Sequence, residues 1–151
     1  MTPPTTPPMD TPATTPAITT DTPQSALSAW FAPWVQALGL KVASLQTDEV
    51  VLRLPQNPAL SRIGGMVCGQ ALMAAADTAM VLAIVTRLGN QRPMTTVQLN
   101  SSFLKPLANQ DALVTARVLR AGKNLVFGEI DIVAAGDGKS VCRASTTYAL
   151  L

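Results

Sequence analysis

The sequence of 151 residues contains no histidine. Without an imidazole, no Ser-His-Asp or Cys-His pair can form, which excludes acyl chemistry by a histidine-activated nucleophile and dehydratases that use a histidine base. The two cysteines, Cys68 and Cys142, are too few for a zinc site when histidine is absent. We therefore expect a protein with no metal site and no cofactor.

Charged and aromatic residues are also scarce. Charged residues make up 13% of the chain, against a usual share of about 25%, and the net charge is only +2. One tyrosine, two tryptophans and three phenylalanines leave few rings for stacking on bases. The chain begins without the charged segment, apolar run and cleavage site of an exported protein. We expect no nucleic-acid partner and a cytoplasmic location.

Residues 1–24 contain seven prolines and nine threonines. Proline disfavours a helix and the segment has almost nothing apolar to bury, so its composition predicts a disordered, polyproline-like tail. A PxxP segment that docks on a partner is the alternative. Residues 25–151 form the predicted folded domain, which is long enough for one core and too short for two ordinary domains.

The folded domain contains several strand-like runs around one long apolar segment. It opens with a short predicted helix that begins at Ser25 and is ended or kinked by Pro33. The apolar anchors of this helix are Trp30, Phe31 and Trp34. A hairpin follows, and four later runs separated by turn residues predict antiparallel strands in a meander. The strands are expected at residues 40–45, 49–54, 94–104, 112–119, 125–133 and 140–150.

Residues 66–88 form the long apolar segment, which ends at a glycine, a helix-stop signal. The segment is apolar almost all round, as in helices buried in lipid or inside a protein. Its length would suit a membrane span, but Asp77 in its middle would be costly in hydrocarbon and the strands would lose their cover. The pattern predicts an α+β fold, in which an antiparallel sheet wraps around one long central helix. A membrane-anchored protein is the alternative.

Several motifs, in order along residues 39–151, resemble those of the hotdog-fold acyl-CoA thioesterases, in particular the PaaI-like (phenylacetate-degradation) group. They are the loop GMVCGQ at 65–70, AADTA at 75–79, TTVQLNSSFLKP at 95–106, RAGK at 120–123 and TTY at 146–148. The resemblance implies the hotdog fold and hydrolysis of an acyl-CoA thioester to a carboxylic acid and free coenzyme A. It also implies a homodimer or a dimer of dimers, with the active site between protomers.

The first motif departs from the family pattern. Cys68 stands where the family has a histidine, and Gln70 replaces its second glycine. Arg62, six residues before Cys68, occupies a position where many relatives have an asparagine or glutamine near the thioester. The change at Arg62 leaves the mode of carbonyl polarisation and the choice of substrate open.

Asp77 is the leading candidate for a catalytic residue, because it is the only acid between Glu49 and Asp111. Thioester hydrolysis needs an activated water or a carboxylate nucleophile, and the thiol, with a pKa of about 8.5, departs without help. Surrounded by alanines, Asp77 is expected to be desolvated and to act as general base or nucleophile. The alternative is a helix acid paired with an arginine of a neighbouring strand.

The start of the helix supplies the rest of the predicted catalytic site. Gly69 lies where free backbone N–H groups and the helix dipole face an anion, which suits an oxyanion hole; tight packing of the turn is its alternative role. Gln70 shares a helix stripe with Asp77 and would orient water or cap the helix. Thr78 would hold the water or bond back to its own helix. A nucleophilic Cys68 is disfavoured, because no histidine can take its proton.

The resemblance also implies which residues contact the substrate. Arg120 and Lys123 flank a tight turn and would hold the phosphates of coenzyme A; the alternative is that they are ordinary solvated surface charges. The full set of predicted substrate contacts is Arg62, Cys68, Asn100, Arg120, Gly122 and Lys123. A second class of function, a non-catalytic hotdog module that binds acyl-CoA, is favoured by the lost histidine and by Arg62. A buried Asp77 distinguishes the two, since a mere binder has no reason to keep it.

Overall fold

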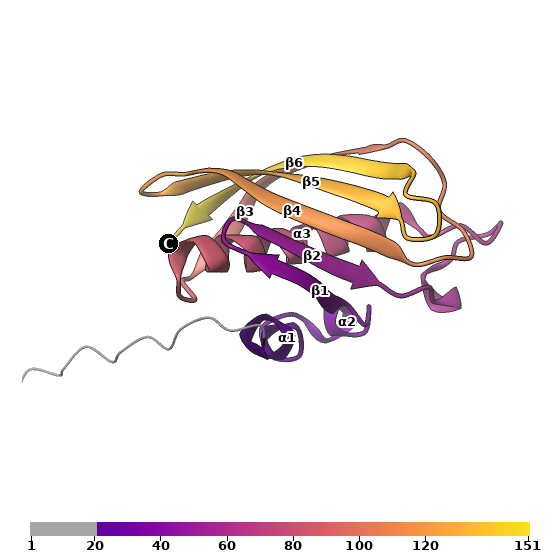
Figure 1. Ribbon diagram of the computed structural model, residues 1–151, viewed down its shortest axis with the longest axis horizontal. Helices are drawn as coiled ribbons and strands as arrows, with labels where there is room; N and C mark the ends of the chain where they lie inside the picture. Colours follow the sequence, from indigo (N-terminus) through magenta and orange to yellow (C-terminus); the bar gives the residue numbers. More distant parts are fainter. Residues whose placement is uncertain (1–20) are drawn as a thin grey trace, which may run out of the picture.

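The computed structural model describes residues 21–151, so residues 1–20 of the predicted tail lie outside it (Figure 1). Two short helices open the described chain, α1 (Asp21–Leu27) and α2 (Pro33–Gln36). Gln24, which the composition assigns to the tail, belongs to α1, and its Oε1 accepts a hydrogen bond of 2.9 Å from the Val42 backbone N–H. Ordered structure therefore begins before the predicted boundary at residue 25.

The single helix predicted around Trp30 is two separate helices. Proline fits the first turn of a helix because no backbone N–H is needed there, so Pro33 begins α2. Trp30 and Phe31, between the helices, pack against the core as predicted. The prediction of Trp34 as an anchor is wrong: the new helix turns this side chain outward, and it is 62% exposed.

The strands are β1 (Lys41–Gln46), β2 (Glu49–Leu54), β3 (Met94–Phe103), β4 (Ala112–Ala121), β5 (Leu125–Ala134) and β6 (Ser140–Leu150). They form one six-stranded antiparallel sheet in the order β1-β2-β4-β5-β6-β3 (Figure 1). The predicted four-strand meander is wrong in one respect, because β3 pairs with β6 and not with β4. The long helix after β2 crosses the sheet and delivers β3 to the far edge.

That helix, α3 (Gly69–Leu88), lies against one face of the sheet (Figure 1). It begins three residues later than predicted because residues 66–68 are extended: the Val67 N–H donates to the Leu107 carbonyl and the Cys68 N–H to the Leu60 carbonyl, each at 2.8 Å. It ends at Gly89, whose φ of 74° is left-handed, a conformation that glycine adopts without strain. The length and composition of α3 would permit a membrane span, but the sheet covers it, so α3 is the core helix of a folded domain. The predicted α+β architecture is confirmed.

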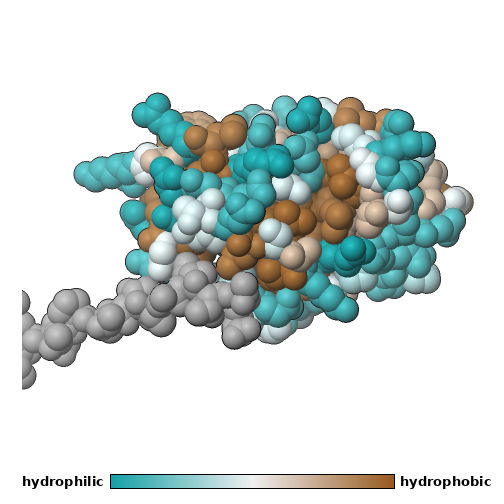
Figure 2. Space-filling view, in the orientation of Figure 1, coloured by the Kyte–Doolittle hydropathy of each residue, from teal (hydrophilic) through white to brown (hydrophobic). Residues whose placement is uncertain are grey.

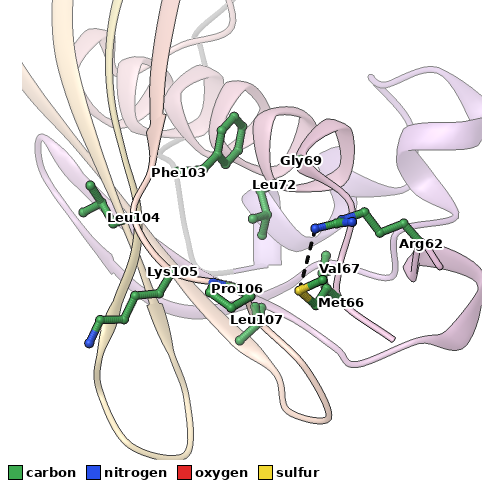
Figure 3. A pocket seen from close by; sticks show the side chains of 10 residues that line it. All are labelled: Arg62, Met66, Val67, Gly69, Leu72, Phe103, Leu104, Lys105, Pro106 and Leu107. Carbon is green, nitrogen blue, oxygen red and sulfur yellow. Dashed lines mark hydrogen bonds between the residues drawn. The ribbon is translucent and has the colours of Figure 1, made fainter. Parts of the chain in front are cut away.

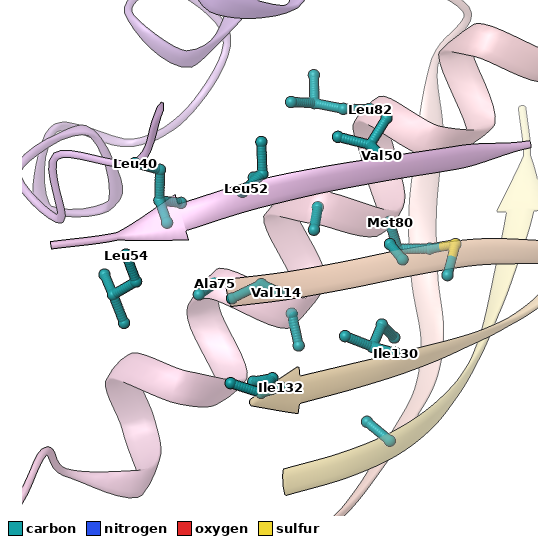
Figure 4. Packing of buried hydrophobic residues seen from close by; sticks show 14 of the residues in the cluster. Leu40, Val50, Leu52, Leu54, Ala75, Met80, Leu82, Val114, Ile130 and Ile132 are labelled. Carbon is teal, nitrogen blue, oxygen red and sulfur yellow. The ribbon is translucent and has the colours of Figure 1, made fainter. Parts of the chain in front are cut away.

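The hydrophobic core lies between α3 and the sheet (Figure 4). Alternate residues of β2 point inward, so Val50, Leu52 and Leu54 are at most 1% exposed. The same alternation buries inward residues of the neighbouring strands, among them Val114, Ile130 and Ile132. Alanines of α3 let the helix approach these strands closely.

One contact between helix and sheet depends on a missing side chain. Gly128 of β5 faces Met80 of α3, and a Cβ added to Gly128 would overlap the sulfur and methyl group of Met80. It would also lie 3.0 Å from the Arg117 carbonyl oxygen. The sheet can approach α3 at this point because position 128 is a glycine.

The two edges of the sheet have different surroundings. At one edge β1 packs against α1, and in Figure 2 hydrophobic residues gather over β1 and its junction with the two short helices. At the other edge β3 pairs only with β6 among the described strands. Large apolar side chains remain exposed there, with Val97 at 60% and Phe103 at 51%.

Candidate active site

The N-terminal end of α3 presents free backbone donors. Cys68 is the N-cap residue, and the N–H groups of Ala71 and Leu72 donate to its carbonyl at 3.2 and 3.4 Å. The N–H groups of Gly69 and Gln70 find no acceptor within residues 21–151. Together with the helix dipole they favour negative charge in front of the helix. An oxyanion hole at Gly69 stays a prediction, with this geometry in its support.

A cavity of about 400 Å³ opens beside Gly69 (Figure 3). Its wall is largely apolar and includes Leu72 of α3 and Phe103 at the end of β3. A Cβ at position 69 would lie only 3.1 Å from Cζ of the Phe103 ring. Glycine at this position therefore lets a ring or a ligand approach the helix backbone closely.

Two cationic residues line the same cavity, and in Figure 3 the Arg62 side chain turns toward Met66, whereas the Lys105 side chain extends away from the other labelled residues. Arg62 is exposed, and its Nη2 donates to the Met66 sulfur at 3.7 Å. Lys105 is exposed as well, and neither residue forms an ion pair within residues 21–151. Arg62 thus adds positive charge near the free N–H groups of α3. Sequence reasoning did not single out Lys105, although it lies within the strand motif at 95–106.

Asp77 is half-buried in the middle of α3 and lies against β3 and β6. Its Oδ1 accepts hydrogen bonds from the Thr96 hydroxyl, at 2.9 Å, and from the Tyr148 hydroxyl. Its Oδ2 accepts none from residues 21–151. The ion pairs among these residues do not include Asp77, so its alternative role as the partner of an arginine is not what the structure has. One oxygen is held, and the other is free to take a proton or attack a carbon.

Tyr148 is a buried donor that fixes this carboxylate. Burial, together with the negative charge of Asp77, raises the pKa of the Tyr148 hydroxyl well above its ordinary value. The phenol therefore stays protonated and continues to donate. Sequence reasoning did not identify Tyr148 and Thr96 as hydrogen-bond partners of Asp77, although both lie in the motifs of the resemblance. The available signal was that a buried tyrosine needs a partner for its hydroxyl.

One copy of the chain does not bring the two parts of the predicted site together. Gly69 and Asp77 are eight residues apart on the same helix. At 1.5 Å per residue they are separated by about 12 Å along its axis. A single thioester carbonyl group cannot touch both, and Asp77 is absent from the wall of the cavity beside Gly69.

The other predicted catalytic residues have different surroundings. Gln70 is exposed at the same end of α3 as Gly69, seven residues from Asp77. Thr78 is buried, and its hydroxyl donates to the Ala74 carbonyl at 2.7 Å, which is the second of its two predicted roles. Cys68 is half-buried at the cap of the helix. Within the described residues, His, Cys, Asp and Glu side chains form no group of three that could hold a metal.

The predicted substrate contacts are scattered in one copy. Asn100 pairs with Ser145 on the face of the sheet that points away from α3, because its neighbours Leu99 and Ser101 face the helix. Arg120, Gly122 and Lys123 are exposed on the β4–β5 hairpin. This hairpin lies at the end of the molecule where α3 finishes, opposite the end that carries Gly69 (Figure 1).

Comparison with known proteins finds solved structures of the same architecture and identifies the family of this chain. The sequence profile of the Thioesterase superfamily matches residues 64–141, which are 78 of the 151 residues. A Saccharolobus solfataricus protein named as an esterase is 31% identical over 70% of this chain and 68% of its own. The structure of a conserved Pseudomonas aeruginosa protein is 29% identical with a TM-score of 0.74, covering 80% of this chain and 95% of that one. The phenylacetic acid degradation protein PaaI of Thermus thermophilus is 26% identical with a TM-score of 0.70, covering 80% and 100%.

An antiparallel sheet wrapped around one long central helix defines a protein of the hotdog fold. The chain belongs to the thioesterase superfamily, and the predicted likeness to its PaaI-like group is confirmed. This membership makes it a thioester hydrolase. The alternative of a membrane-anchored protein is not supported, since α3 is the buried core helix.

Proposed function

We propose that this enzyme hydrolyses acyl-CoA thioesters to a carboxylic acid and free coenzyme A, at a site shared by two copies of the chain. One observation carries the proposal: Asp77 and the free N–H of Gly69 lie about 12 Å apart on one rigid helix. The two groups can act on one carbonyl only if they come from different copies. A symmetric pair with antiparallel α3 helices would form two such sites, each with Asp77 from one copy and Gly69 from the other.

The β3 edge supports this pairing. Open N–H and C=O groups on an edge strand can pair with another strand, and exposed apolar side chains such as Val97 and Phe103 gain from being covered. Because Thr96 of β3 holds Asp77, an interface along β3 would bring a second copy to the carboxylate. The pair is a homodimer, alone or within a dimer of dimers.

The chemistry proposed for the shared site uses few groups. Oδ2 of Asp77 either takes a proton from water, which attacks the thioester carbon, or attacks that carbon itself to form an anhydride that water then hydrolyses. Thr96 and Tyr148 hold Oδ1, so the free oxygen keeps its direction. The developing oxyanion is stabilised by the partner's Gly69 N–H, an interaction worth about 3 kcal/mol in other enzymes. The thiolate of coenzyme A leaves without an acid catalyst.

Cationic side chains would bind the phosphates of coenzyme A. Arg62 and Lys105 line the cavity beside Gly69, and Arg120 and Lys123 lie at the opposite end of the same copy. In a pair with antiparallel α3 helices, the Gly69 end of one copy lies beside the end of the other copy that carries the β4–β5 hairpin. The cations Arg62 and Lys105 of one copy and the partner's Arg120 would then face the same coenzyme A. The two free cysteines suit a reducing compartment, and we propose that the enzyme acts in the cytoplasm.

Subunit complementation tests the shared site. One variant carries Asp77→Asn, and the other carries Gly69→Pro, which removes the N–H at a helix position that tolerates proline. Each variant alone is expected to be inactive. When the two are unfolded together and refolded, random pairing makes half of the dimers mixed, and each mixed dimer has one intact site of two, so about a quarter of the wild-type activity returns.

Gly69→Ala is the matched control, because alanine adds the same Cβ against Phe103 but keeps the N–H. It should retain much more activity than Gly69→Pro. If the mixed sample stays inactive while each variant still forms dimers, the site is not shared in this way.

A further inference from the structure

Two side chains of β3 that belong to the candidate site lie an odd number of residues apart. Thr96 donates to Asp77 in the middle of α3, and the Phe103 ring lies beside Gly69 at the start of that helix (Figure 3). Both side chains therefore face α3, although their positions differ by seven. Side chains alternate between the two faces of a regular strand, so an odd separation would place one of them on the outer face.

One extra residue in β3 removes this conflict. Between Thr96 and Gln98 the strand advances by two residues while its partner β6 advances by one, so Val97 is a bulge residue. Over the same stretch β6 alternates without a break, and every second side chain from Tyr148 back to Cys142 is buried. The bulge therefore returns Phe103 to the face of β3 that Thr96 occupies.

A buried hydroxyl of β6 is bonded to the backbone of this bulge. The Thr146 hydroxyl donates to the Gln98 carbonyl oxygen at 2.7 Å, and the Thr146 side chain is only 4% exposed. Within residues 21–151, no other side chain forms a hydrogen bond to the backbone of residues 96–98. A bulge locally disrupts the ladder of backbone hydrogen bonds. The bond from Thr146 therefore helps to fix the backbone where the ladder is interrupted.

We propose that Thr146 is a positioning residue for hydrolysis: its hydroxyl holds the Val97 bulge, and the bulge aims the Thr96 hydroxyl at Asp77. The proposal rests on the proposed function, in which Thr96 helps to fix the catalytic carboxylate. Thr146 does not itself donate to Asp77, whose hydrogen bonds come from Thr96 and Tyr148. It acts through the backbone of β3 and not on the reacting atoms.

Two substitutions at position 146 test this role. Thr146→Val removes the hydroxyl and keeps the branched shape, whereas Thr146→Ser keeps the hydroxyl. In the valine variant we expect kcat for acyl-CoA hydrolysis to fall about five-fold with KM within about two-fold, because Asp77 loses its fixed direction. The serine variant should keep at least about half of the wild-type kcat. A valine variant with full kcat would overturn the proposal, and so would a serine variant as impaired as the valine one.

Combination with Thr96→Val separates positioning from general stabilisation. If Thr146 acts through Thr96, Thr146→Val should change kcat by less than about two-fold once the Thr96 hydroxyl is absent. Losses of kcat that multiply in the double variant would show that Thr146 acts independently of Thr96, and the proposal would be wrong.

Thr86→Val is the matched control, because the Thr86 hydroxyl also donates to a backbone carbonyl at 2.7 Å. It accepts from the Asp48 N–H as well, so its loss should lower the midpoint of urea unfolding. Thr86 lies about 14 Å along α3 from Asp77, so kcat should stay within about two-fold of the wild-type value. Equal losses of kcat in Thr86→Val and Thr146→Val would mean that lowered stability explains both, and would overturn the proposal.

Amide hydrogen exchange tests the bulge without any substrate. Thr146→Val should speed exchange of the backbone amides of residues 96–99, relative to those of β2, at least about ten-fold, and Thr86→Val should not. If exchange speeds up in this way but the wild-type protein hydrolyses no acyl-CoA, Thr146 holds the bulge and the proposed hydrolysis fails. If acyl-CoA is hydrolysed but the relative exchange does not change, Thr146 does not hold the bulge and the proposed hydrolysis stands.

Discussion

The two edge strands of the sheet are built alike and surrounded differently. Each has one bulge, at Ala43 in β1 and at Val97 in β3. The β1 edge packs against α1, and the Val42 N–H next to its bulge donates to Gln24. The β3 edge has no such cover within residues 21–151, and its bulge residue is a largely exposed valine.

The acidic residues near the two edges also differ in whether they form an ion pair. Near β1, Asp48 pairs with Arg87 at 2.6 Å and ties the hairpin to the end of α3. Near β3, Asp77 has no cationic partner in the described chain and keeps one oxygen free. An exposed edge is normally covered unless it is used. The comparison indicates that the β1 edge is covered by the chain itself, whereas the β3 edge is left open for the proposed contact with a second copy.

Asp77→Asn should have the largest effect of the substitutions that test this contrast. Asparagine keeps the size of the side chain, so the helix should still pack and the oligomer should persist. It has no negative charge to take a proton or attack the thioester. We expect kcat for acyl-CoA hydrolysis to fall about 100-fold or more with KM within a few-fold, measured by release of free thiol.

Asp48→Asn makes the same chemical change near the other edge. Asparagine tolerates the positive φ of 70° at this position, so the main loss is a partly exposed ion pair. The free energy of unfolding of the Asp48→Asn variant should fall by less than about 1 kcal/mol, and its kcat should not change. Equal losses of kcat in the two variants would contradict the contrast.

Val97→Lys should have the next largest effect, because it introduces a charge at the exposed bulge of β3. We expect dissociation to monomers and a loss of activity of at least about ten-fold, since the proposed site needs two copies. Ala43→Lys puts the same charge on the exposed bulge of β1 and should alter neither property. Light scattering and thiol release on the same samples test both. A dimeric, active Val97→Lys variant would show that β3 is not the interface.

Tyr148→Phe, near the β3 edge, should lower kcat less than the preceding substitutions. It removes one of the two donors to Asp77 Oδ1 and leaves the ring in place. We expect kcat to fall about ten-fold, because the carboxylate loses its fixed direction, and the free energy of unfolding to fall by about 1 kcal/mol. Thr96→Val removes the other donor and should behave similarly. If the two variants lose stability but keep full kcat, these donors are structural only.

Asp111→Asn, on the β2 side of the sheet, should have the smallest effect. Hydrogen bonds from the Gln56 N–H and from Arg53 hold the pKa of Asp111 below its ordinary value. The carboxylate therefore stabilises the fold above its ordinary pKa of about 3.9, and this contribution is lost as the pH falls through the lowered pKa. We expect the variant to be destabilised by less than about 1 kcal/mol near neutral pH, with no difference from wild type near about pH 2. Urea unfolding at both pH values measures this, and a gap that widens in acid would contradict it.

The elements of this fold could be predicted because their signals are local. The apolar run before Gly89 and the alternation in β2 each specify an element within a few residues. The position of β3 could not be predicted in the same way, because the Thr96–Tyr148 pair joins residues 52 positions apart. The orientation of Trp34 depends on a second helix start at Pro33, where the pattern allowed an end or a kink.

The candidate site likewise contains some residues that the local sequence indicates and others that only the pairing of distant strands brings together. Asp77 stands out in the sequence because an acid in an alanine-rich helix is unusual, and Gly69 because it opens that helix. Their separation along α3 follows from the spacing alone. The hydroxyls that hold Asp77 were missed because Thr96 and Tyr148 reach it only after the strands have paired.

The close approach of Met80 to Gly128 has a consequence for how this sequence can change over evolutionary time. A Cβ at position 128 would force the end of the Met80 side chain to move, so a larger residue at position 128 fits more easily beside a shorter side chain at position 80. Among relatives with the same spacing of helix and sheet, a larger residue at one position should accompany a smaller one at the other. Since Met80 lies only three residues after Asp77, a change at position 128 without a matching change at position 80 would shift the turn of α3 that carries this candidate catalytic residue, without altering any residue of the site.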